Sequence, residues 1–563
     1  MPNNDPLRVA EAALTAPGAP FEVVRAEDGS PMYAGGPRTL REFVEATWAY
    51  GDRPFLIAES GSYTYGEFFA AASALARRFV EDYGLAPGDR AVIAMRNHPE
   101  WQVAFWAAQL AGVVAVPLNA WWTEAEFTYA LDDCTPSVLL VDGERLPRVQ
   151  PWLAARSEPR RPKVVVFHGD AGQWGEAYEG IRAADPHLAP PDVDVRAEHD
   201  ATIIYTSGTT GRPKGAVATH LAQAGAATHP RFHAALSALG RGQIPGQGPT
   251  PVSLMTFPFF HVAAFTALYA AMAAGGTLVL MHKWDAGRAL TLIREHKVTH
   301  YAGVPATALQ LLDAAEAAGD GLQSLAMLNT GGAAAPAGLV GRLTARHGER
   351  IEPRNGYGLT ETSGGVMANF GAAYRAYPGS VGRPAPGTEV RIAGPHGQPL
   401  LDGEVGELWL RGQSLVRGYW NDPEATAQAF ADGGWFRTGD LATVRDRRVS
   451  IVDRIKDMVI RGGENVYCVE VESALHDHPD VLDAAVLGVP HPVLGEEVAA
   501  VVQLRPGATA GADELRAHVA KGLAAFKVPA HVLVRDEPLP RNATGKILKR
   551  ELRTTTDRLV SGG

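Results

Sequence analysis

Short apolar runs alternate with longer segments of helical periodicity up to about residue 378. The runs are rich in Val, Ile and Leu and lie at 90–97, 112–119, 137–143, 162–169, 200–208 and 276–283. Between two such runs lie segments such as Tyr65–Asp82, in which apolar residues recur at helical spacing. Strands that are buried on both faces and alternate with helices are typical of parallel sheets. We therefore predict an α/β fold.

The pattern changes towards the C-terminus. From about Gly379 to Asp453, short strands and many glycines predict a small antiparallel unit or distorted β-barrel, and a smaller α+β pattern follows Arg454. A chain of 563 residues exceeds what one hydrophobic core normally supports. We expect a large N-terminal domain at 1–454, with subdomains at roughly 39–200, 201–378 and 379–454, and a small C-terminal domain at 455–563.

One segment is apolar enough to resemble a membrane span. Phe259–Met281 contains no Asp, Glu, Lys or Arg and is long enough to cross a bilayer. However, His261 lies within it, and the pair Gly275-Gly276 divides it. We interpret it as a buried helix, a turn and a buried strand. The run 240–251 is rich in Gly and Pro and predicts a surface loop.

Composition excludes several classes of protein. The formal net charge of −10 argues against a nucleic-acid-binding protein, which needs an excess of Lys and Arg. Two cysteines, Cys134 and Cys468, are too few for a disulfide framework or a thiolate metal site and suit a reducing, cytoplasmic location. The N-terminal residues show no basic segment leading into an apolar run, so we expect no signal peptide.

The segment from Tyr205 to Gly215, YTSGTTGRPKG, follows the buried run ATIIY. Its glycines let the backbone approach a ligand, and its hydroxyls and backbone N–H groups can donate to phosphate oxygens. Arg212 and Lys214 add positive charge. The spacing differs from that of a Walker P-loop, which needs Gly-Lys-Ser/Thr after the first glycine. The segment predicts a phosphate-binding loop, with a ligand-free surface loop as the alternative.

This segment resembles the phosphate loop of the adenylate-forming superfamily of acyl-CoA synthetases, luciferases and peptide-synthetase adenylation domains. The resemblance continues in order along the chain, from about Thr39 to Arg550. It implies an enzyme that binds ATP and Mg²⁺, joins a carboxylic acid to AMP and passes the acyl group to coenzyme A. It also implies that the small C-terminal domain is mobile. The ATP-binding residues that it implies in the loop are Thr206, Ser207, Gly208, Thr209, Thr210, Gly211 and Lys214.

A second motif runs from Thr330 to Ala333 and continues at Asn355-Gly356-Tyr357-Gly358-Leu359-Thr360-Glu361. Glycines around one tyrosine leave a slot for a flat base, and the hydroxyl and carboxylate suit a phosphate and its cation. The third glycine of a dinucleotide fingerprint is missing. By resemblance, the ATP site also includes Gly332, Ala333, Asn355, Gly356, Tyr357 and Gly358, with Thr360 on the α-phosphate and Glu361 on Mg²⁺.

Three later motifs complete the resemblance. Asp440, in the segment WFRTGD, matches the residue that accepts hydrogen bonds from the ribose hydroxyls. Arg454 matches a phosphate-binding arginine, Lys456 the hinge between the domains, and the Gly463 loop the wall of the pantetheine channel. Lys546 matches the lysine that bridges the acid and the α-phosphate during adenylation. One departure is Cys468, where many relatives carry proline, and we do not interpret it as a nucleophile.

The acyl pocket is less sharply defined. By resemblance, His261 lies near the acyl and pantetheine channel, although an ordinary buried histidine is an equal alternative. With Val304 and Gly331 it suggests an apolar pocket, which favours a fatty acid of medium to long chain, then an aryl acid. His229 and His233, and His296 and His300, have spacings that could share a helical face, but without further ligands we expect no metal there.

Three alternatives stay open from the sequence. The acyl group could pass to an acyl carrier protein, or to another nucleophile such as an amine. A third alternative is a non-catalytic nucleotide- or acyl-binding protein, which would have no use for Lys546. A monomer and a homodimer are equally compatible with the sequence.

Overall fold

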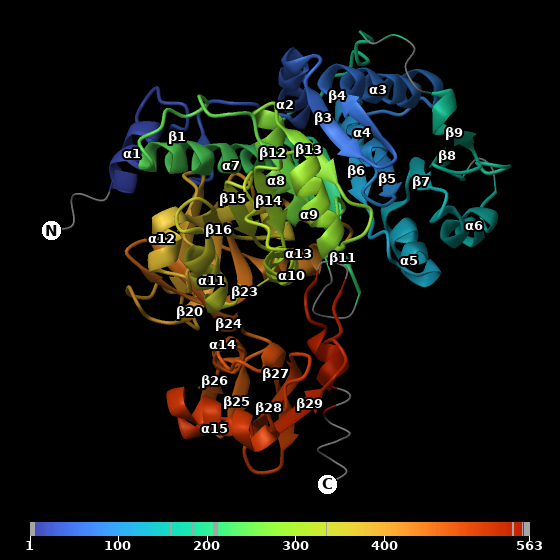
Figure 1. The fold of residues 1–563 in the computed structure, drawn as a ribbon. Coiled ribbons are helices and arrows are strands. Elements are labelled where there is room, and N and C mark those ends of the chain that lie inside the picture. The colour runs from blue at the N-terminus through green and yellow to red at the C-terminus, as the bar shows by residue number, and fades with distance from the viewer. Residues whose placement is uncertain are drawn as a thin grey trace.

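The computed structural model describes residues 6–157, 160–181, 185, 187–206, 212–333, 335–542, 545–553 and 556. Figure 1 shows a large N-terminal body and, below it, a smaller unit that contains α14, α15 and β25–β29. The predicted α/β class and the large and small domains are confirmed. Among the described residues, no helix has the length and apolar character that a membrane span requires.

Two large sheets form the centre of the N-terminal body. The first has eight strands in the order β21-β11-β10-β6-β5-β7-β8-β9, and β10 to β9 along this path are parallel. Its strands are β5 (Arg90–Ala94), β6 (Val114–Pro117), β7 (Val138–Asp142), β8 (Lys163–Phe167), β9 (Glu176–Ala177), β10 (Asp200–Thr206), β11 (Lys214–Thr219) and β21 (Gly418–Tyr419). The predicted strand runs are thus confirmed.

The second sheet has nine strands in the order β18-β17-β16-β15-β14-β12-β13-β3-β4. Its strands are β3 (Pro54–Ala58), β4 (Gly61–Thr64), β12 (Val252–Met255), β13 (Thr277–Leu280), β14 (His300–Gly303), β15 (Met327–Thr330), β16 (Glu352–Leu359), β17 (Gly364–Phe370) and β18 (Arg383–Pro384). A short hairpin, β1 (Val23–Arg25) with β2 (Pro31–Tyr33), lies outside both sheets.

The predicted division of the large domain at residue 200 does not follow the sheets. β3 and β4 come early in the chain but belong to the second sheet, where β3 pairs with β13. β10 and β11 come after residue 199 but belong to the first sheet, where β10 pairs with β6. Buried parallel strands have the same apolar pattern in either sheet, so the pattern does not reveal which sheet a strand joins.

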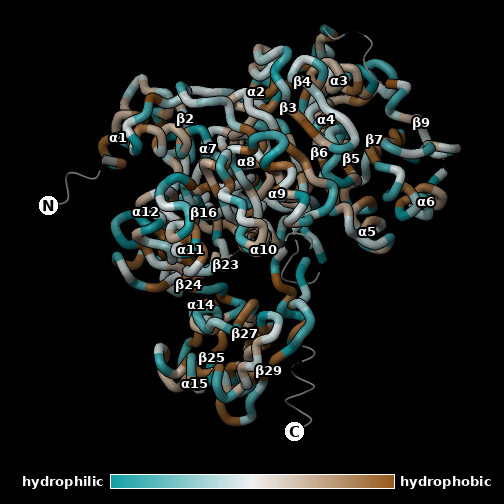
Figure 2. Tube along the Cα trace, viewed as in Figure 1, coloured by the Kyte–Doolittle hydropathy of each residue, from teal (hydrophilic) through white to brown (hydrophobic). Residues whose placement is uncertain are grey.

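Helices cover and separate the two sheets. Along β5, Ala91 and Ile93 join one apolar cluster while Val92 and Ala94 join another, as the two-residue period of a strand requires. The cluster shared by both sheets includes side chains of α3, α4 and α8, such as Phe68, Trp101 and Phe265. In Figure 2 the strands of both sheets are brown where these helices cover them. The core therefore lies between the sheets and on their outer faces.

The helices of the body connect these strands along the chain. They are α1 (Pro6–Thr15), α2 (Leu40–Thr47), α3 (Tyr65–Arg77), α4 (Pro99–Leu110), α5 (Glu124–Cys134), α6 (Leu146–Ala154), α7 (His220–Gly240), α8 (Val262–Ala273), α9 (Ala286–Glu295), α10 (Pro305–Ala317), α11 (Ala337–His347), α12 (Gly371–Ala376) and α13 (Pro423–Ala429). The segment 259–281 is a buried helix, a turn and a strand, as predicted, and 241–251 is a loop.

Two smaller sheets complete the fold. The antiparallel unit contains β19 (Thr388–Ala393), β20 (Gly406–Gly412), β22 (Phe430–Ala431), β23 (Trp435–Arg445) and β24 (Arg448–Arg454). Among the described residues its pairing path is open, from β19 to β22 with β24 added to β23, so the expected barrel is an open one. The C-terminal unit contains β25 (Val459–Arg461), β26 (Glu464–Val466), α14 (Cys468–His476), β27 (Val481–His491), β28 (Gly495–Leu504), α15 (Ala512–Gly522) and β29 (His531–Arg535).

Candidate active site

The ends of the predicted phosphate loop lie side by side. Thr206 ends β10 and Lys214 begins β11, and the two residues are antiparallel partners. Ser207, Gly208, Thr209, Thr210 and Gly211 lie outside the described residues. The ammonium nitrogen of Lys214 lies 3.8 Å from an Asp422 carboxylate oxygen and 5.4 Å from the centre of the Tyr419 ring. A lysine at this end of the loop can face a phosphate held by it.

Glu361 follows β16 in a short 3₁₀ turn, Thr360–Thr362. Tyr419 donates its hydroxyl to Glu361 Oε1 at 2.7 Å, and the N–H of Val416 bonds to the Glu361 carbonyl at 2.9 Å. Burial raises the pKa of the Glu361 carboxyl above its usual value. The adjacent Thr360 hydroxyl and this carboxylate are hard oxygen donors, and a cation would offset the cost of burying the charge. The site therefore fits Mg²⁺.

Sequence reasoning missed Tyr419, which links Glu361 to Lys214. The residue lies on β21, a strand of two residues that pairs with β11. Its only signal in the sequence is an aromatic residue after Arg417-Gly418 in a glycine-containing stretch. Nothing in that pattern identifies a partner for a carboxylate.

A tyrosine, an aspartate and an arginine from three strands meet beside this turn. Tyr357 on β16 donates its hydroxyl to Asp440 Oδ2 at 2.6 Å, and Arg454 Nε lies 3.4 Å from Asp440 Oδ1. Asp440 and Arg454 are cross-strand partners on β23 and β24, which explains their proximity. Burial and the neighbouring Asp440 raise the pKa of Tyr357 well above its usual value, so Tyr357 stays a neutral donor.

The glycine-rich motif forms a narrow junction between β15 and β16. These strands are parallel, with Thr330 opposite Asn355, and Asn355 is buried. A side chain on Gly358 would place its Cβ 2.0 Å from the Gly364 carbonyl oxygen, so only glycine fits there. The Cβ of a residue replacing Gly331 would lie 3.6 Å from the Gly356 carbonyl oxygen. Gly332 is exposed and Ala333 half-buried.

Lys546 lies in a tight turn that reaches the large domain. Its N–H bonds to the Asn542 side chain at 2.9 Å, and its carbonyl accepts the Asn542 N–H at 2.9 Å. A Cβ built on the preceding Gly545 would lie 3.0 Å from a methyl group of Val304. Figure 1 shows this red segment extending from the small unit towards the body. Burial, with Arg454 and Lys456 nearby, lowers the pKa of Lys546 to about 8.

The expected channel residues lie close to this turn. His261 caps α8 by accepting the N–H of Ala263 at 3.2 Å. Burial, with the charge of Lys546 adding to it, lowers the pKa of His261 to about 4, so its imidazole is neutral near pH 7. A Cβ on Gly332 would lie 3.8 Å from both Val304 and Phe257. The structure thus brings together His261, Val304, Gly332 and Lys546.

Gly463 and Lys456 have different surroundings. Gly463 lies in the two-residue turn between β25 and β26 at a φ of +89°, and a Cβ built there would meet no atom within 4 Å. Lys456 is exposed in the turn after β24. The described contacts therefore place the turn of Lys546, rather than the turn of Gly463, against the large domain.

Cys468 is a buried residue at the first turn of α14. Its N–H donates to the carboxylate of Asp453, next to Arg454, and Asp453 also accepts the Arg454 N–H at 2.8 Å. A proline at position 468 could not donate this hydrogen bond. Burial raises the pKa of the Cys468 thiol, which agrees with the expectation that it is not a nucleophile.

The two histidine pairs differ from each other. His229 and His233 both lie buried on α7, one turn apart. His296 ends α9 and His300 begins β14, so the expectation that they could share a helical face is wrong. Lys297 between them has a φ of +50°, which ends the helix. Among the described residues, the only three-residue cluster with metal-ligating geometry contains neither pair.

Comparison with known proteins agrees with this geometry. The family model for AMP-binding enzymes matches residues 43–420, and the model for the AMP-binding enzyme C-terminal domain matches residues 470–546. A feruloyl-CoA synthase from an Amycolatopsis species is 36% identical over 492 residues, which cover 87% of this chain and 93% of that protein. The long-chain-fatty-acid–CoA ligase FadD13 of Mycobacterium tuberculosis is 34% identical, over 86% and 92% of the two chains.

A solved structure extends the similarity to the fold. The amide bond synthetase McbA from Marinactinospora thermotolerans superposes with a TM-score of 0.78 and 28% identity, and the match covers 92% of this chain and 100% of that one. The family match spans more than half of the chain, and it includes the phosphate loop, Tyr357 and the turn of Lys546. This chain belongs to the AMP-binding enzymes.

Proposed function

We propose that this protein is an ATP-dependent acid–CoA ligase that forms an acyl-adenylate and then an acyl-CoA thioester. The observation that carries the proposal is the position of Lys546. This partly buried ammonium group, which has few roles in a simple binding protein, lies near His261, and the preceding Gly545 packs against Val304. The ammonium group faces the strands that carry Asp440 and Arg454.

In the first half-reaction, a carboxylate oxygen of the acid attacks the α-phosphorus of ATP. The bond from that phosphorus to the bridging oxygen breaks, and pyrophosphate leaves with the electron pair. Lys546 and Thr360 hold the two anions together and stabilise charge on the α-phosphate, while Lys214 and the 206–211 loop bind the outgoing phosphates. Asp440 accepts the ribose hydroxyls, and Tyr357 stacks against adenine. Catalysis is therefore positioning and electrostatic stabilisation.

The metal site is part of this proposal. Glu361 would hold Mg²⁺, with Thr360 beside it, and Tyr419 orients the carboxylate through its 2.7 Å hydrogen bond. The bound cation would neutralise charge on the phosphates. Without it, burial opposes ionisation of Glu361. Loss of Tyr419 would leave the carboxylate in place but with a less defined orientation.

In the second half-reaction, the thiol sulfur of coenzyme A attacks the acyl carbonyl, the bond to the AMP oxygen breaks, and the thiol proton is lost to solvent. The turn of Gly463 must then replace the turn of Lys546 at the site. We propose that the small domain, 455–563, rotates about Lys456 between the two arrangements. The exposed Lys456, at the end of β24, is well placed to absorb the necessary change in backbone angles.

The proposed acid is a fatty acid of medium to long chain, with an aryl acid as the next candidate. The apolar side chains of Phe257, Ala263 and Val304 surround Gly332 and favour an apolar acyl group there. The curated relatives that activate feruloyl and long-chain acyl groups are compatible with either acid. We also propose a cytoplasmic location, which two buried free thiols favour.

A second candidate differs only in the acceptor. The similarity to an amide bond synthetase favours transfer of the acyl group to an amine, and a carrier-protein thiol is chemically equivalent to coenzyme A. Adenylation would proceed through the same residues. Only the second half-reaction distinguishes these acceptors.

The test measures both halves at once. Purified protein is incubated with ATP, Mg²⁺ and a panel of fatty and aryl acids, with and without coenzyme A. Pyrophosphate is followed continuously and products are identified by mass spectrometry. Joint appearance of pyrophosphate, AMP and an acyl-CoA supports the ligase. Acyl-adenylate without thioester supports the alternative acceptor, and absence of pyrophosphate with every acid contradicts both.

A further inference from the structure

Two histidines and a glutamate gather at one edge of the eight-stranded sheet, outside the proposed ATP site. His98 is the N-cap of α4, Glu100 lies in the first turn of that helix, and His168 follows β8. One ligating atom from each residue lies within 4.8 Å of the other two. β5 and β8 are both parallel neighbours of β7, so their carboxyl ends bring these segments to the same edge.

The three side chains are held by their surroundings. Glu100 is buried, accepts the Tyr63 hydroxyl at 3.1 Å and lies 2.8 Å from His168 Nε2. The rings of His98 and His168 are 4.3 Å apart between centroids. His168 adopts a left-handed backbone conformation, with a φ of 51°, which is unfavourable for a residue other than glycine. Its carbonyl packs against Gly143, where a Cβ would come within 2.7 Å.

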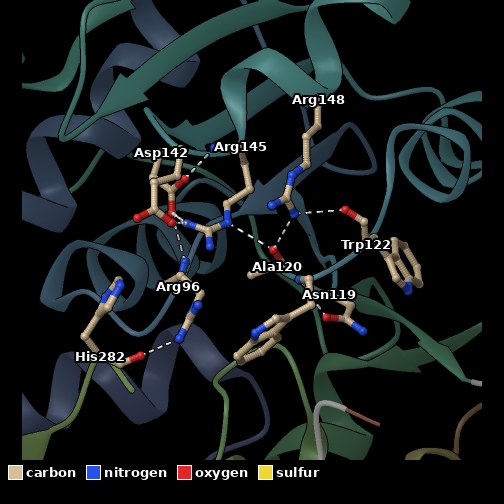
Figure 3. Close-up of polar contacts among 10 residues, drawn as sticks. Arg96, Asn119, Ala120, Trp122, Asp142, Arg145, Arg148 and His282 are labelled. Carbon is tan, nitrogen blue, oxygen red and sulfur yellow. Dashed lines mark hydrogen bonds and ion pairs between the residues drawn. The ribbon is translucent and has the colours of Figure 1, made fainter. Parts of the chain in front are cut away.

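A further imidazole lies on the neighbouring sheet. His282 follows β13, and its ring centroid is 5.4 Å from that of His98. Figure 3 shows His282 beside Arg96, whose guanidinium donates to the His282 carbonyl at 2.5 Å. His282 is exposed, and so is His168, so solvent ions can reach the cluster. His282 thus places an imidazole from the second sheet beside the three-residue cluster.

Nearby guanidinium groups are balanced by carboxylates. Arg145 pairs with Asp142 at 2.9 Å and with Glu144 at 2.5 Å, and Figure 3 shows the Asp142 pair beside Arg96. With Arg148, three arginines lie near three carboxylates, those of Asp142, Glu144 and Glu100. The hydrogen bond to Glu100 raises the pKa of His168, so a bound cation would have to displace a proton from that imidazole.

We propose that His98, Glu100 and His168 bind one divalent transition cation of the zinc class. Two imidazoles and one carboxylate are a ligand set that Zn²⁺ accepts in tetrahedral geometry, with a fourth position for water or a further imidazole. Bonds of about 2.0–2.1 Å in a tetrahedral site would separate the ligand atoms by about 3.4 Å. The 2.8 Å contact between Glu100 and His168 must therefore open slightly, and any longer separation in the cluster must shorten. The alternative is a Glu100–His168 ion pair with a second histidine stacked on it, which would bind no cation.

Binding would also stiffen the wall of the acyl channel. Asn97, the neighbour of His98, donates to the Phe257 carbonyl at 2.8 Å and accepts the Phe259 N–H at 2.9 Å. Phe257 to Phe259 lead directly into His261. A cation on His98 therefore constrains the residue that holds this loop, and we expect a rise in Tm when the cation binds.

The test uses untagged full-length protein from which metals have been removed by a chelator and dialysis. Zn²⁺ is titrated by calorimetry, and Co²⁺ by its visible absorption bands. We expect one cation per chain and a higher Tm with Zn²⁺. His98→Ala and His168→Gln should weaken binding by more than about tenfold, since even indirect disturbance of a metal site costs about that much.

The matched control is His396→Ala, which removes an exposed histidine from the turn between β19 and β20. It should bind Co²⁺ as the wild type does. The Tm of each metal-free variant shows whether it is folded, and none of these measurements depends on ligase activity. Equal Co²⁺ affinity in the wild type, His98→Ala and His168→Gln would overturn the proposal, as would the absence of a one-to-one complex.

Discussion

Two turns of the small domain have nearly the same backbone but opposite surroundings. Gly545 has a φ of +79° and Gly463 a φ of +89°, so each turn needs glycine for the same conformational reason. A side chain at Gly545 would press on Val304 of the large domain, whereas one at Gly463 would meet nothing. The two turns therefore differ in what they face, and the arrangement is the one expected for adenylation.

The comparison shows that two turns with similar glycine φ angles can have different surroundings in one arrangement of the domains. Burial lowers the pKa of Lys546, and the charges of Arg454 and Lys456 add to the effect. The proposed swing of the small domain would change that environment. The same swing would bury the turn of Gly463. Each turn should thus affect one half-reaction and spare the other, and the following predictions test that separation.

The largest effect is expected for Lys546→Ala. Loss of this preorganised cation should slow adenylation by roughly 10²–10³ or more, because charge at the α-phosphate loses its main partner. Conversion of supplied acyl-adenylate and coenzyme A to thioester should stay within a few-fold of wild type. Pyrophosphate release measures the first half and mass spectrometry the second. Equal loss in both halves would contradict the separation of the turns.

The opposite pattern, with thioester formation slowed and adenylation preserved, is expected for Gly463→Leu. A leucine side chain should obstruct the pantetheine arm and slow thioester formation by about tenfold or more. That slowing corresponds to a rise of about 1.4 kcal/mol in the activation free energy. Adenylation should be preserved. The control is Gly507→Leu, which imposes the same backbone strain in another exposed turn of the small domain, at a φ of +81° with no atom near. Similar slowing by both variants would indicate general damage to that domain.

The pH profile should differ between the halves. Burial lowers the pKa of Lys546 to about 8, so the ammonium form is complete well below pH 8 and is lost as pH rises through that value. The kcat/KM for ATP in adenylation should fall about tenfold per pH unit on the alkaline side. Lys546→Arg should be slower but lack this fall. An unchanged alkaline fall in Lys546→Arg would assign it to another group.

The smallest effect is expected for Gly545→Ala. The added methyl group should press on Val304 and strain the backbone at a φ of +79°, and together these effects should slow adenylation by about fivefold, or roughly 1 kcal/mol. Val304→Ala in the same chain should recover part of that loss by removing the methyl group at 3.0 Å. The two single variants and the double variant form a cycle, and strict additivity would show that the turn does not dock on Val304.

Residue patterns predict the buried strands and both glycine turns. They do not predict which turn faces the large domain, for a physical reason. Runs of Val and Ile identify β5 to β8 because strands that are buried on both faces consist mainly of apolar residues. The order of motifs predicts chemical roles for Lys546 and Gly463. Which of the two turns faces the body depends on the domain position, and local sequence does not determine that position.

Two side-chain contacts of the site could not be predicted from the sequence for another reason. Tyr357 and Asp440 are 83 residues apart, and Tyr419 and Glu361 are 58 residues apart, and each pair joins segments from different sheets. Single-sequence periodicity describes one strand at a time and gives no register between strands. The expectation for His300 is wrong for a local reason, because Lys297 ends the helix with a left-handed backbone that a spacing rule does not anticipate.

The exchange of strands between the two large sheets has a consequence for biosynthesis. β3 leaves the ribosome more than two hundred residues before its neighbour β13, and β6 is translated well before its partner β10. Neither sheet can close its hydrogen bonds while only the first third of the polypeptide has emerged. The resulting high contact order slows folding and leaves unpaired edges exposed for longer. The nascent chain should therefore depend on chaperones until α8 and β13 have been translated.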